Sequence, residues 1–237
     1  MPTIDLPVRF HDYQQQHTIL AVPVDRTAFA IIDCFGDCGP EHNLVVENQI
    51  APALAAARRV GMKVIYFHNA PGGEGGPWNV SRELHGTRLG RERLGPPGWK
   101  PSRPDYAPAI TPRDDEPEFQ KAQRNGFRDT FADQYLRTCN IDTLIMVGFS
   151  LRSCLYHTVH GAMEHNYRAI VLRDCTCPAG TKEYSDTIDP SNPEGGWVRF
   201  IFLRMIETNE GYTATSIDFA RACAGAQLLD PSVMRGS

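Results

Sequence analysis

The stretch Thr143-Leu-Ile-Met-Val-Gly-Phe-Ser-Leu-Arg-Ser-Cys154 decides the fold. Its first half is apolar and predicts a short buried strand, and the apolar pattern over residues 151–163 predicts the helix that follows. Cys154 would then lie near the helix N-terminus, where backbone N–H groups and the helix dipole stabilise a thiolate. The stretch therefore indicates an α/β protein with a candidate nucleophile, although a lone cysteine here is also typical of a small buried apolar side chain.

The same alternation recurs along the rest of the chain. Residues 28–33 predict an apolar strand, residues 44–60 have helical periodicity, and residues 63–68 predict the next strand. A strand-helix-strand unit of this length implies parallel pairing with a right-handed crossover. The predicted strands are 28–33, 63–68, 119–122, 143–147, 168–174 and 212–216. We therefore predict an α/β fold with a doubly wound, mostly parallel, six-stranded sheet and helices on both faces, a three-layer α/β/α arrangement.

The domain organisation predicted is one domain over residues 28–237, preceded by an N-terminal extension over residues 1–27 that packs on the outside. Between residues 69 and 118 the periodicity is lost, and Gly, Pro and Arg are frequent. Loops of this length in a compact domain usually cover or form binding sites. Trp78 and Trp99 argue against full disorder, because large aromatic side chains need a packing partner. We expect segment 69–118 to cover the active site, with packing between subunits as the alternative.

The charge balance restricts the possible partners. The chain has 24 Lys and Arg against 28 Asp and Glu, a net charge of −4, and no basic stripe that would follow nucleic acid phosphates. It has no apolar run of about 18 residues, and its first residues lack the pattern of a signal peptide. Its seven cysteines are an odd number without secretory context, which favours reduced thiols. We expect a cytoplasmic protein that binds neither nucleic acid nor membrane.

Two cysteine pairs raise the question of a metal site. Cys34 and Cys38 are separated by three residues, but Cys175 and Cys177 are separated by only one. Structural zinc sites usually use pairs with two to four residues between the ligands. The second pair more plausibly ends a strand, so we expect no metal and no cofactor.

Three reactive residues follow or end predicted strands. Asp33 ends the first strand, Lys121 lies on the third, and Cys154 follows the fourth. Ligands of doubly wound sheets bind outside the carboxyl ends of the strands, so the three side chains could share one crevice. Taken singly, Asp33 could cap a loop and Lys121 could be a solvated charge. Their joint placement favours a catalytic site, and we call these residues the trio.

Three motifs resemble those of the isochorismatase-like cysteine hydrolases, over residues 28–224. Ala30-Ile-Ile-Asp33 is similar to the first-strand motif that ends in the catalytic aspartate, and Lys121-Ala-Gln-Arg-Asn-Gly-Phe127 is similar to the segment of the catalytic lysine. The spacing from Gly148 to Cys154 matches the nucleophile loop. The resemblance implies that the trio is catalytic and that the protein is a homodimer or homotetramer. It further implies a cis peptide between Phe149 and Ser150 and an oxyanion hole made by the N–H groups of Ser150 and Cys154.

Departures from the family pattern bear on the substrate. Phe35 stands where the family commonly has Gln, and Leu151 stands where it commonly has Thr. Members that use a metal to hold a pyridine ring carry an Asp-x-His motif, which is absent from Phe67-His-Asn-Ala-Pro71, so nicotinamidase is disfavoured. Members that cleave the vinyl ether of isochorismate can lack the nucleophile, so Cys154 argues against that subgroup.

Short matches favour the ureide-cleaving members of the family. They are Phe67-His-Asn69, Asn79 beyond a Gly-rich loop, Asn125-Gly-Phe127, Asp174 and Ala179-Gly180. The resemblance thus implies an amidohydrolase that cleaves a C–N bond, other than a peptide bond, of a small ureide, carbamoyl or amide substrate. Ammonia or an amine would be released.

The mechanism predicted from these residues is covalent. Only about 3% of a free cysteine is thiolate at neutral pH, so the thiol needs neighbours that activate it. We expect Asp33 to take the thiol proton, Lys121 to steady the charges and Cys154 to attack the carbonyl. The N–H groups of Ser150 and Cys154 would hold the oxyanion.

Substrate-binding residues are predicted around this centre. Asn69 and Asn79 could hydrogen-bond a planar ureido group, and Phe35, Phe127 and Phe149 could wall the pocket. Both asparagines could instead serve turns. An arginine of segment 69–118 could clamp a substrate carboxylate; the candidates are Arg82 and Arg88.

Two alternative functions remain open from the sequence. One is an amidase that acts on maleamate-like or N-carbamoyl amino acid substrates. The other is a binding module of the same fold whose thiols sense oxidation without hydrolysing anything.

Overall fold

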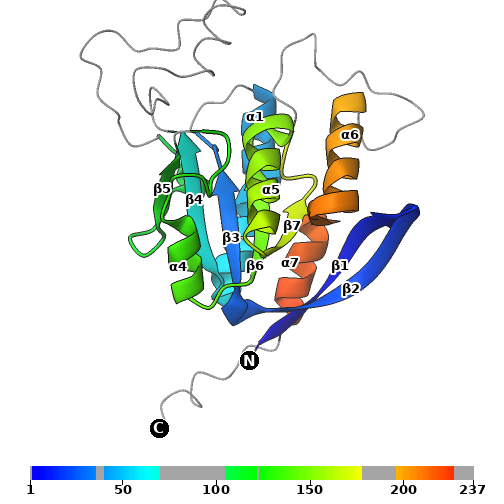
Figure 1. The fold of residues 1–237 in the computed structure, drawn as a ribbon. Helices are drawn as coiled ribbons and strands as arrows, with labels where there is room; N and C mark the ends of the chain where they lie inside the picture. Colours follow the sequence, from blue (N-terminus) through cyan, green and yellow to red (C-terminus); the bar gives the residue numbers. More distant parts are fainter. Residues whose placement is uncertain (1, 36–39, 70–104, 122, 178–195, 227–237) are drawn as a thin grey trace, which may run out of the picture.

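The computed structural model describes residues 2–35, 40–69, 105–121, 123–177 and 196–226. These residues form one mixed sheet with the strand order β2-β1-β8-β7-β6-β3-β4-β5 (Figure 1). The strands are β1 (Thr3–Asp12), β2 (Gln14–Pro23), β3 (Thr27–Ile32), β4 (Lys63–Asn69), β5 (Glu118–Lys121), β6 (Thr143–Gly148), β7 (Arg168–Leu172) and β8 (Gly211–Ala214). The α-helices are α1 (Pro40–Val45), α2 (Ala51–Val60), α4 (Ala132–Thr138), α5 (Tyr156–Glu164), α6 (Trp197–Met205) and α7 (Ser216–Gly225).

Short 3-10 and π segments complete the secondary structure. They are η1 (Val24–Arg26), η2 (Val46–Ile50), η3 (Pro108–Ile110), η4 (Leu151–Leu155) and η5 (Ile206–Glu210). Segment η2 joins α1 to α2, so the helical stretch runs over residues 40–60 and begins four residues before the predicted one. Gly61 ends it in the left-handed conformation, with φ of 83°.

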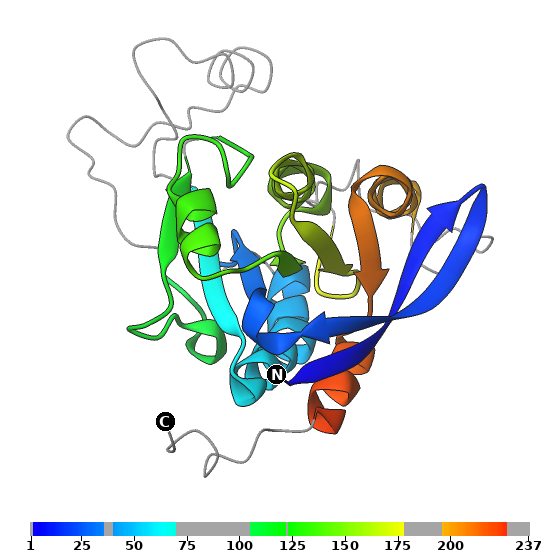
Figure 2. The ribbon, with the colours of Figure 1, turned by 60° about the horizontal axis from the view of Figure 1, so that its bottom comes forward.

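The sheet has eight strands in the described residues, so the prediction of six was wrong. The two additional strands, β1 and β2, come from the predicted extension and form an antiparallel hairpin. The hairpin joins the sheet where Arg9 of β1 pairs with Thr213 of β8 (Figure 2). Buried and exposed residues alternate along β1, as is typical of a strand with one face in the core. The division into an extension and a single domain itself stays a prediction.

The remaining six strands are parallel, as predicted. Strands β3 and β6 lie side by side at the centre. Strands β4 and β5 follow on the β3 side, and strands β7 and β8 follow on the β6 side. Both strands are buried over their whole length, which explains their continuous apolar sequences. The place where the strand order reverses is therefore the boundary between β3 and β6. Ligands of doubly wound sheets bind at such a boundary.

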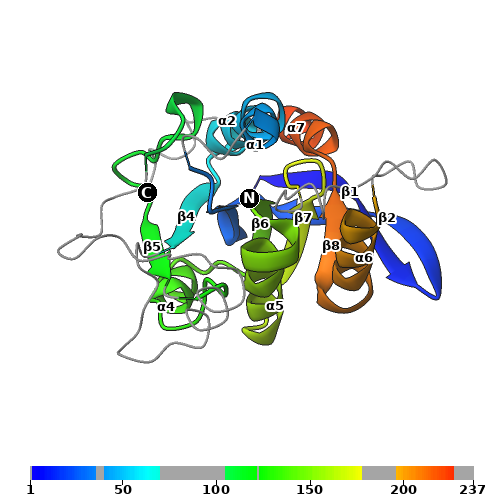
Figure 3. The ribbon, with the colours of Figure 1, turned by 90° about the horizontal axis from the view of Figure 1, so that it is seen from above.

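Helices cover both faces of the sheet, which confirms the predicted three layers. Figure 3 shows α1, α2 and α7 on one face and α4, α5 and α6 on the other. Each face has its own hydrophobic cluster. Residues of β3 alternate between the two clusters: Phe29 and Ile31 face the first, and Ala30 and Ile32 face the second. The carboxyl ends of the central strands are held between two packed layers.

Most of the segment predicted to cover the active site, residues 70–104, lies outside the described residues. Its last part is held against α2 and β4. The Arg58 guanidinium binds the Glu116 carboxylate at 2.6 Å, and the Tyr66 hydroxyl donates to the Ile110 carbonyl at 2.9 Å. This anchor fixes the direction in which the chain enters β5. The covering role of the segment stays a prediction.

Gly148 ends β6 and pairs with Ile32, the last residue of β3. Its φ is 116°, and a Cβ atom here would lie 2.0 Å from the carbonyl oxygen of Ile32. That oxygen accepts a hydrogen bond from the N–H of Phe149 at 2.8 Å. A side chain at position 148 would therefore separate the two central strands where the site begins.

We predict that Gly148→Ala lowers the free energy of unfolding by about 2–5 kcal/mol, because left-handed strain adds to a clash with backbone. The matched control is Gly61→Ala, since Gly61 has φ of 83° but a Cβ atom there would meet no other atom within 4 Å. The control should lose only about 1–2 kcal/mol. Urea unfolding of both variants measures the difference. Equal losses would contradict the close approach of β6 to β3.

Candidate active site

The carboxyl ends of β3 and β6 bring Asp33 and the turn after Gly148 together. Asp33 follows β3 with φ of 50°, a left-handed conformation that aspartate adopts more readily than most residues. Its N–H donates to the carbonyl of Phe67 in the neighbouring strand β4 at 2.9 Å. The chain therefore leaves β3 in a fixed direction, and the Asp33 carboxylate is held at the boundary between the two halves of the sheet.

Asp33 and Lys121 form a buried ion pair. Lys121 Nζ lies 2.8 Å from Asp33 Oδ2, and the lysine side chain is 0% exposed and the aspartate side chain 6%. Strands β4 and β5 set this distance, because their register places Lys121 opposite Asn69. A charged pair without solvent requires further hydrogen bonds to offset the loss of hydration.

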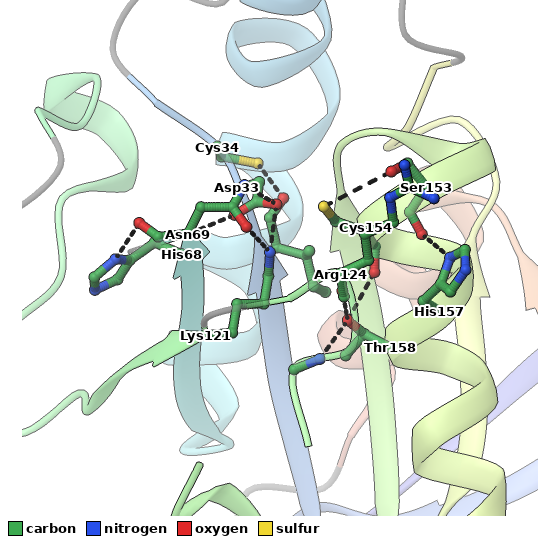
Figure 4. Close-up of polar contacts among 12 residues, drawn as sticks. Asp33, Cys34, His68, Asn69, Lys121, Arg124, Ser153, Cys154, His157 and Thr158 are labelled. Carbon is green, nitrogen blue, oxygen red and sulfur yellow. Dashed lines mark hydrogen bonds and ion pairs between the residues drawn. The ribbon is translucent and has the colours of Figure 1, made fainter. Parts of the chain in front are cut away.

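Asn69 supplies those hydrogen bonds. Its backbone N–H and its side-chain Nδ2 donate to the two oxygens of Asp33 at 3.0 and 3.2 Å, and its Oδ1 accepts from Lys121 Nζ at 2.5 Å (Figure 4). One amide thus orients both charged groups. The sequence analysis predicted Asn69 as a substrate-binding residue and missed this positioning contact. That substrate role stays a prediction.

Cys154 lies in the turn between β6 and α5. Its side chain points toward Asp33 from the opposite half of the sheet (Figure 4), and its Sγ lies 3.9 Å from Ser153 Oγ. Segment η4 is irregular, because Ser153 has φ of −135° and ψ of −107°. Regular α-helix begins at Tyr156, two residues after the cysteine. The structure therefore brings the three residues of the trio together.

The Cys154 thiol has a pKa above its ordinary value. Burial is the largest cause, because it disfavours the charged thiolate, and the negative charge of Asp33 is the second. A hydrogen bond to Asp33 also raises this pKa, whereas Lys121 and Ser153 lower it. Cys154 is therefore a protonated thiol at neutral pH that points toward the Asp33 carboxylate. The sequence analysis expected the helix N-terminus to stabilise a thiolate, whereas the net shift of the thiol pKa is upward.

The peptide between Phe149 and Ser150 is cis, as the family resemblance implied. The Ser150 carbonyl accepts hydrogen bonds from the N–H groups of Ser153 and Leu155 at 2.9 and 3.2 Å. The N–H of Leu151 donates to the Cys177 carbonyl at 3.0 Å. These bonds fix the loop that carries the N–H groups of Ser150 and Cys154. Their role as an oxyanion hole stays a prediction.

Thr158 links the nucleophile turn to the lysine segment, a contact that the sequence analysis missed. Its hydroxyl donates to the Cys154 carbonyl at 2.7 Å and accepts from the N–H of Gly126 at 3.0 Å (Figure 4). Asn125 strengthens the link, because its Oδ1 accepts from the N–H of Phe127 at 2.8 Å. A Cβ atom on Gly161 of α5 would lie 2.3 Å from that same oxygen. In the sequence, the only local indication of this contact is the motif Asn125-Gly-Phe127.

The predicted wall residues have different surroundings. Phe127 is buried, and its recorded ring contacts are with Phe67, His165 and Tyr167 in the hydrophobic cluster. Phe149 is buried at the start of the turn that carries Cys154, and the centroids of the Phe149 and His42 rings are 4.5 Å apart. Phe35 is half-buried two residues after Asp33. Asn79, Arg82 and Arg88 lie outside the described residues. All of these substrate contacts stay predictions.

The described residues contain neither a cluster of metal ligands nor a membrane-spanning helix. Within the described ranges, no group of three or more His, Cys, Asp or Glu side chains is arranged to hold a metal ion. Cys34 and Cys175 are buried cysteines in the reduced form, Cys177 is a half-buried reduced cysteine, and Cys38 lies outside the described residues. Among the described helices, each is too short or too polar to span a bilayer.

The fold and the trio together define a candidate hydrolase of the α/β class. Comparison with known proteins supports this class, because the isochorismatase domain model matches residues 12–199. The chain belongs to the isochorismatase domain family.

Two curated relatives are ureidoacrylate amidohydrolases named RutB. The protein from Methylorubrum extorquens AM1 is 33% identical over 191 residues, which cover 75% of this chain and 69% of the relative. The protein from Azorhizobium caulinodans is 30% identical over 191 residues, 75% of this chain and 76% of the relative.

Solved structures share the fold. A cysteine hydrolase from Pseudomonas syringae pv. phaseolicola 1448A superposes with a TM-score of 0.69 at 21% identity, covering 86% of this chain and 94% of that protein. N-carbamoylsarcosine amidase from Thermoplasma acidophilum superposes with a TM-score of 0.57 at 20% identity, covering 81% and 96%.

We predict that Asp33→Asn lowers the pKa of the Cys154 thiol, because it removes a negative charge and a hydrogen-bond acceptor that stabilise the protonated form. Ser153→Ala should raise that pKa, because the Ser153 hydroxyl favours the thiolate. The measurement is the rate of Cys154 alkylation by iodoacetamide against pH, read by peptide mass spectrometry. A pKa of Cys154 that shifts in the same direction in both variants would contradict the placement of Asp33 and Ser153 around the thiol.

Proposed function

We propose that this protein is a cysteine-dependent amidohydrolase that cleaves a C–N bond of a small ureide or carbamoyl substrate. Its enzyme class is that of hydrolases acting on carbon–nitrogen bonds other than peptide bonds. One observation carries the proposal: the Cys154 thiol points toward the Asp33 carboxylate, and Lys121 Nζ holds that carboxylate at 2.8 Å. A thiol, a base and a cation in one buried cluster are the components of nucleophilic acyl transfer.

The first step is the attack of sulfur on the substrate carbonyl. As the S–C bond forms, the thiol proton passes to Asp33, so no free thiolate is needed beforehand. Lys121 remains next to the carboxylate and limits the change in local charge. Burial raises the pKa of Cys154, which keeps the thiol protonated until a substrate carbonyl is in place.

The tetrahedral intermediate carries its negative charge on the former carbonyl oxygen. The N–H groups of Ser150 and Cys154 would donate to that oxygen, and each such donor is typically worth about 3 kcal/mol. Collapse of the intermediate breaks the C–N bond, and Asp33 returns the proton to the leaving nitrogen. Ammonia or an amine leaves, and the carbonyl carbon stays bound to sulfur as a thiocarbamate or thioester.

Water completes the reaction. Asp33, again a carboxylate, takes a proton from water as the oxygen attacks the carbonyl carbon. The S–C bond breaks, and the sulfur recovers a proton from Asp33. Every proton thus passes through one carboxylate, which accords with the hydrogen bonds that fix both of its oxygens.

The ureide substrate class rests on similarity to relatives. Two relatives at 30% identity or above are named ureidoacrylate amidohydrolase, and a structure of the same fold is N-carbamoylsarcosine amidase. All of these names describe a carbamoyl or ureido group. We keep the cytoplasmic location, the lack of a cofactor, and the absence of nucleic acid and membrane partners as predictions.

We predict that Cys154→Ala removes turnover by at least about 10⁴-fold while leaving the fold intact, because no other group in the trio can form the acyl bond. The assay is ammonia release from a panel of ureides, N-carbamoyl amino acids and maleamate-like amides. Intact mass spectra of the wild type should show a covalent adduct with a slow substrate, and Asp33→Asn should show none.

The matched control for this experiment is Cys139→Ala, which removes a half-buried free thiol at the end of α4. It should keep full activity. A fully active Cys154→Ala enzyme would refute the mechanism. Release of ammonia from amides but not from ureides would favour the simple amidase, and no release from any compound would favour the thiol-sensing module.

We predict that Thr158→Val lowers kcat about tenfold with little change in KM, because the nucleophile turn loses its link to the lysine segment while the substrate pocket keeps its shape. Thr158→Ser keeps the hydroxyl and should restore kcat. Steady-state kinetics of both variants provide the measurement. A purely structural role would instead lower stability in both variants without the split between kcat and KM.

A further inference from the structure

Strand β2 lies at one end of the strand order, so one of its long sides is an edge of the sheet. It pairs with β1 at all ten positions from Gln14 to Pro23, in one continuous register. On its other side, no strand of the described part of the chain pairs with it. A strand edge presents a row of backbone N–H and C=O groups that can pair with another chain.

This edge lacks the features that protect sheet edges in monomeric proteins. Such edges usually carry lysines, internal prolines or bulges. The sequence of β2, QQQHTILAVP, contains no Asp, Glu, Lys or Arg, and its only proline is the final residue. The regular register with β1 leaves no bulge. Most residues of β2 are exposed, and Ile19 is 66% exposed.

One face of the hairpin carries the exposed Ile19 beside Pro7, next to the polar pair Arg9 and His17. The register pairs Pro7 with Ile19 and Arg9 with His17, and Arg9 binds Glu207 of η5 at 2.6 Å. This face therefore lies on the side of the sheet that carries α6 and η5. Figures 1 and 3 show the hairpin projecting outward past α6.

Helix α6 adds a second exposed apolar group on that same side. Trp197, Ile201 and Met205 occur at every fourth position and are 64%, 47% and 37% exposed. Residues with this spacing form one stripe along a helix. The opposite side of α6 is already packed, because Leu203 is buried in the hydrophobic cluster beneath it. The edge and the stripe together form a surface at one end of the molecule.

We propose that this surface binds a second copy of the chain, with β2 pairing antiparallel to β2 of the partner across a two-fold axis. Such an interface is isologous, so the strand meets its own sequence. Self-pairing brings no like charges together, because β2 is uncharged. The lack of charge also gives a basic or acidic partner nothing to recognise, which favours a second copy over another macromolecule.

The geometry brings the apolar groups together in the same interface. A two-fold axis perpendicular to the sheet keeps corresponding faces of the two copies on the same side. The α6 helices of both copies then flank the junction and cover the Ile19 face of the joined hairpins. Stable interfaces bury about 1,600 Å² in total, more than one strand pair provides, so the α6 stripe is a necessary part of the contact.

The interface is separate from the candidate active site. Strands β1, β8 and β7 lie between β2 and β6. Neighbouring strands are about 4.8 Å apart, so β2 is roughly 19 Å from the strand that leads to Cys154. Disruption of the edge therefore leaves the trio in place, and the proposal does not depend on the proposed catalytic activity.

The test is the mass of the full-length protein in solution, measured by light scattering after gel filtration at about 50 µM, well above the dissociation constant of a specific interface. Ile19→Lys places a charge at the centre of the edge and should halve the mass of the assembly. Thr18→Lys places it on the other face of the same strand and should have the same effect. The matched control is Ile217→Lys on α7, at an isoleucine that is 59% exposed.

Circular dichroism establishes that each variant is folded, and both edge residues are exposed enough to accept lysine. Halved mass in the two edge variants with unchanged mass in Ile217→Lys supports the proposal. A monomeric wild-type protein overturns it. An unchanged mass in folded Ile19→Lys and Thr18→Lys also overturns it, because the copies then assemble through another surface or the edge is covered by this chain itself.

Discussion

The structure depends on the ion pair between Asp33 and Lys121. Both side chains are removed from water at the carboxyl ends of β3 and β5, and loss of either partner of such a pair typically costs about 3–5 kcal/mol. Asn69 makes the pair tolerable, because it hydrogen-bonds both charged groups. The register of β3, β4 and β5 therefore has to place these three residues together. A sheet optimised for stability alone would carry apolar side chains here, so the pair indicates a function.

The ion pair also determines the state of the nucleophile. An isolated Lys121 would draw Cys154 toward the thiolate, but the neighbouring carboxylate and burial raise the pKa of the thiol. The outcome is a neutral thiol that points toward a base, which differs from cysteine sites that hold a preformed thiolate near a helix N-terminus. Proton transfer and bond formation are thus coupled in one step.

The sequence predicted the core of the fold better than its edge. Strands β3, β6 and β7 are buried on both faces, so their apolar runs are unambiguous. The β1–β2 hairpin was missed because β2 is mostly exposed and the turn rests on Tyr13, whose φ of 54° is not a turn signal from residue type. Topology likewise placed Asp33, Lys121 and Cys154 together. It could not show that Asn69 and Thr158 join them, since those bonds connect residues distant in sequence.

The two halves of the sheet contribute different parts of the chemistry. The base and the cation come from β3 and β5, whereas the nucleophile follows β6, so reactivity depends on how the halves are aligned across the boundary. Gly148 sets that alignment through the backbone, and Thr158 sets it through the Cys154 carbonyl and the Gly126 N–H. Because each residue of the trio is held in this way, little freedom remains there for choosing a substrate. We predict that selectivity arises in the chain that follows the strands, beginning with Phe35 two residues after Asp33.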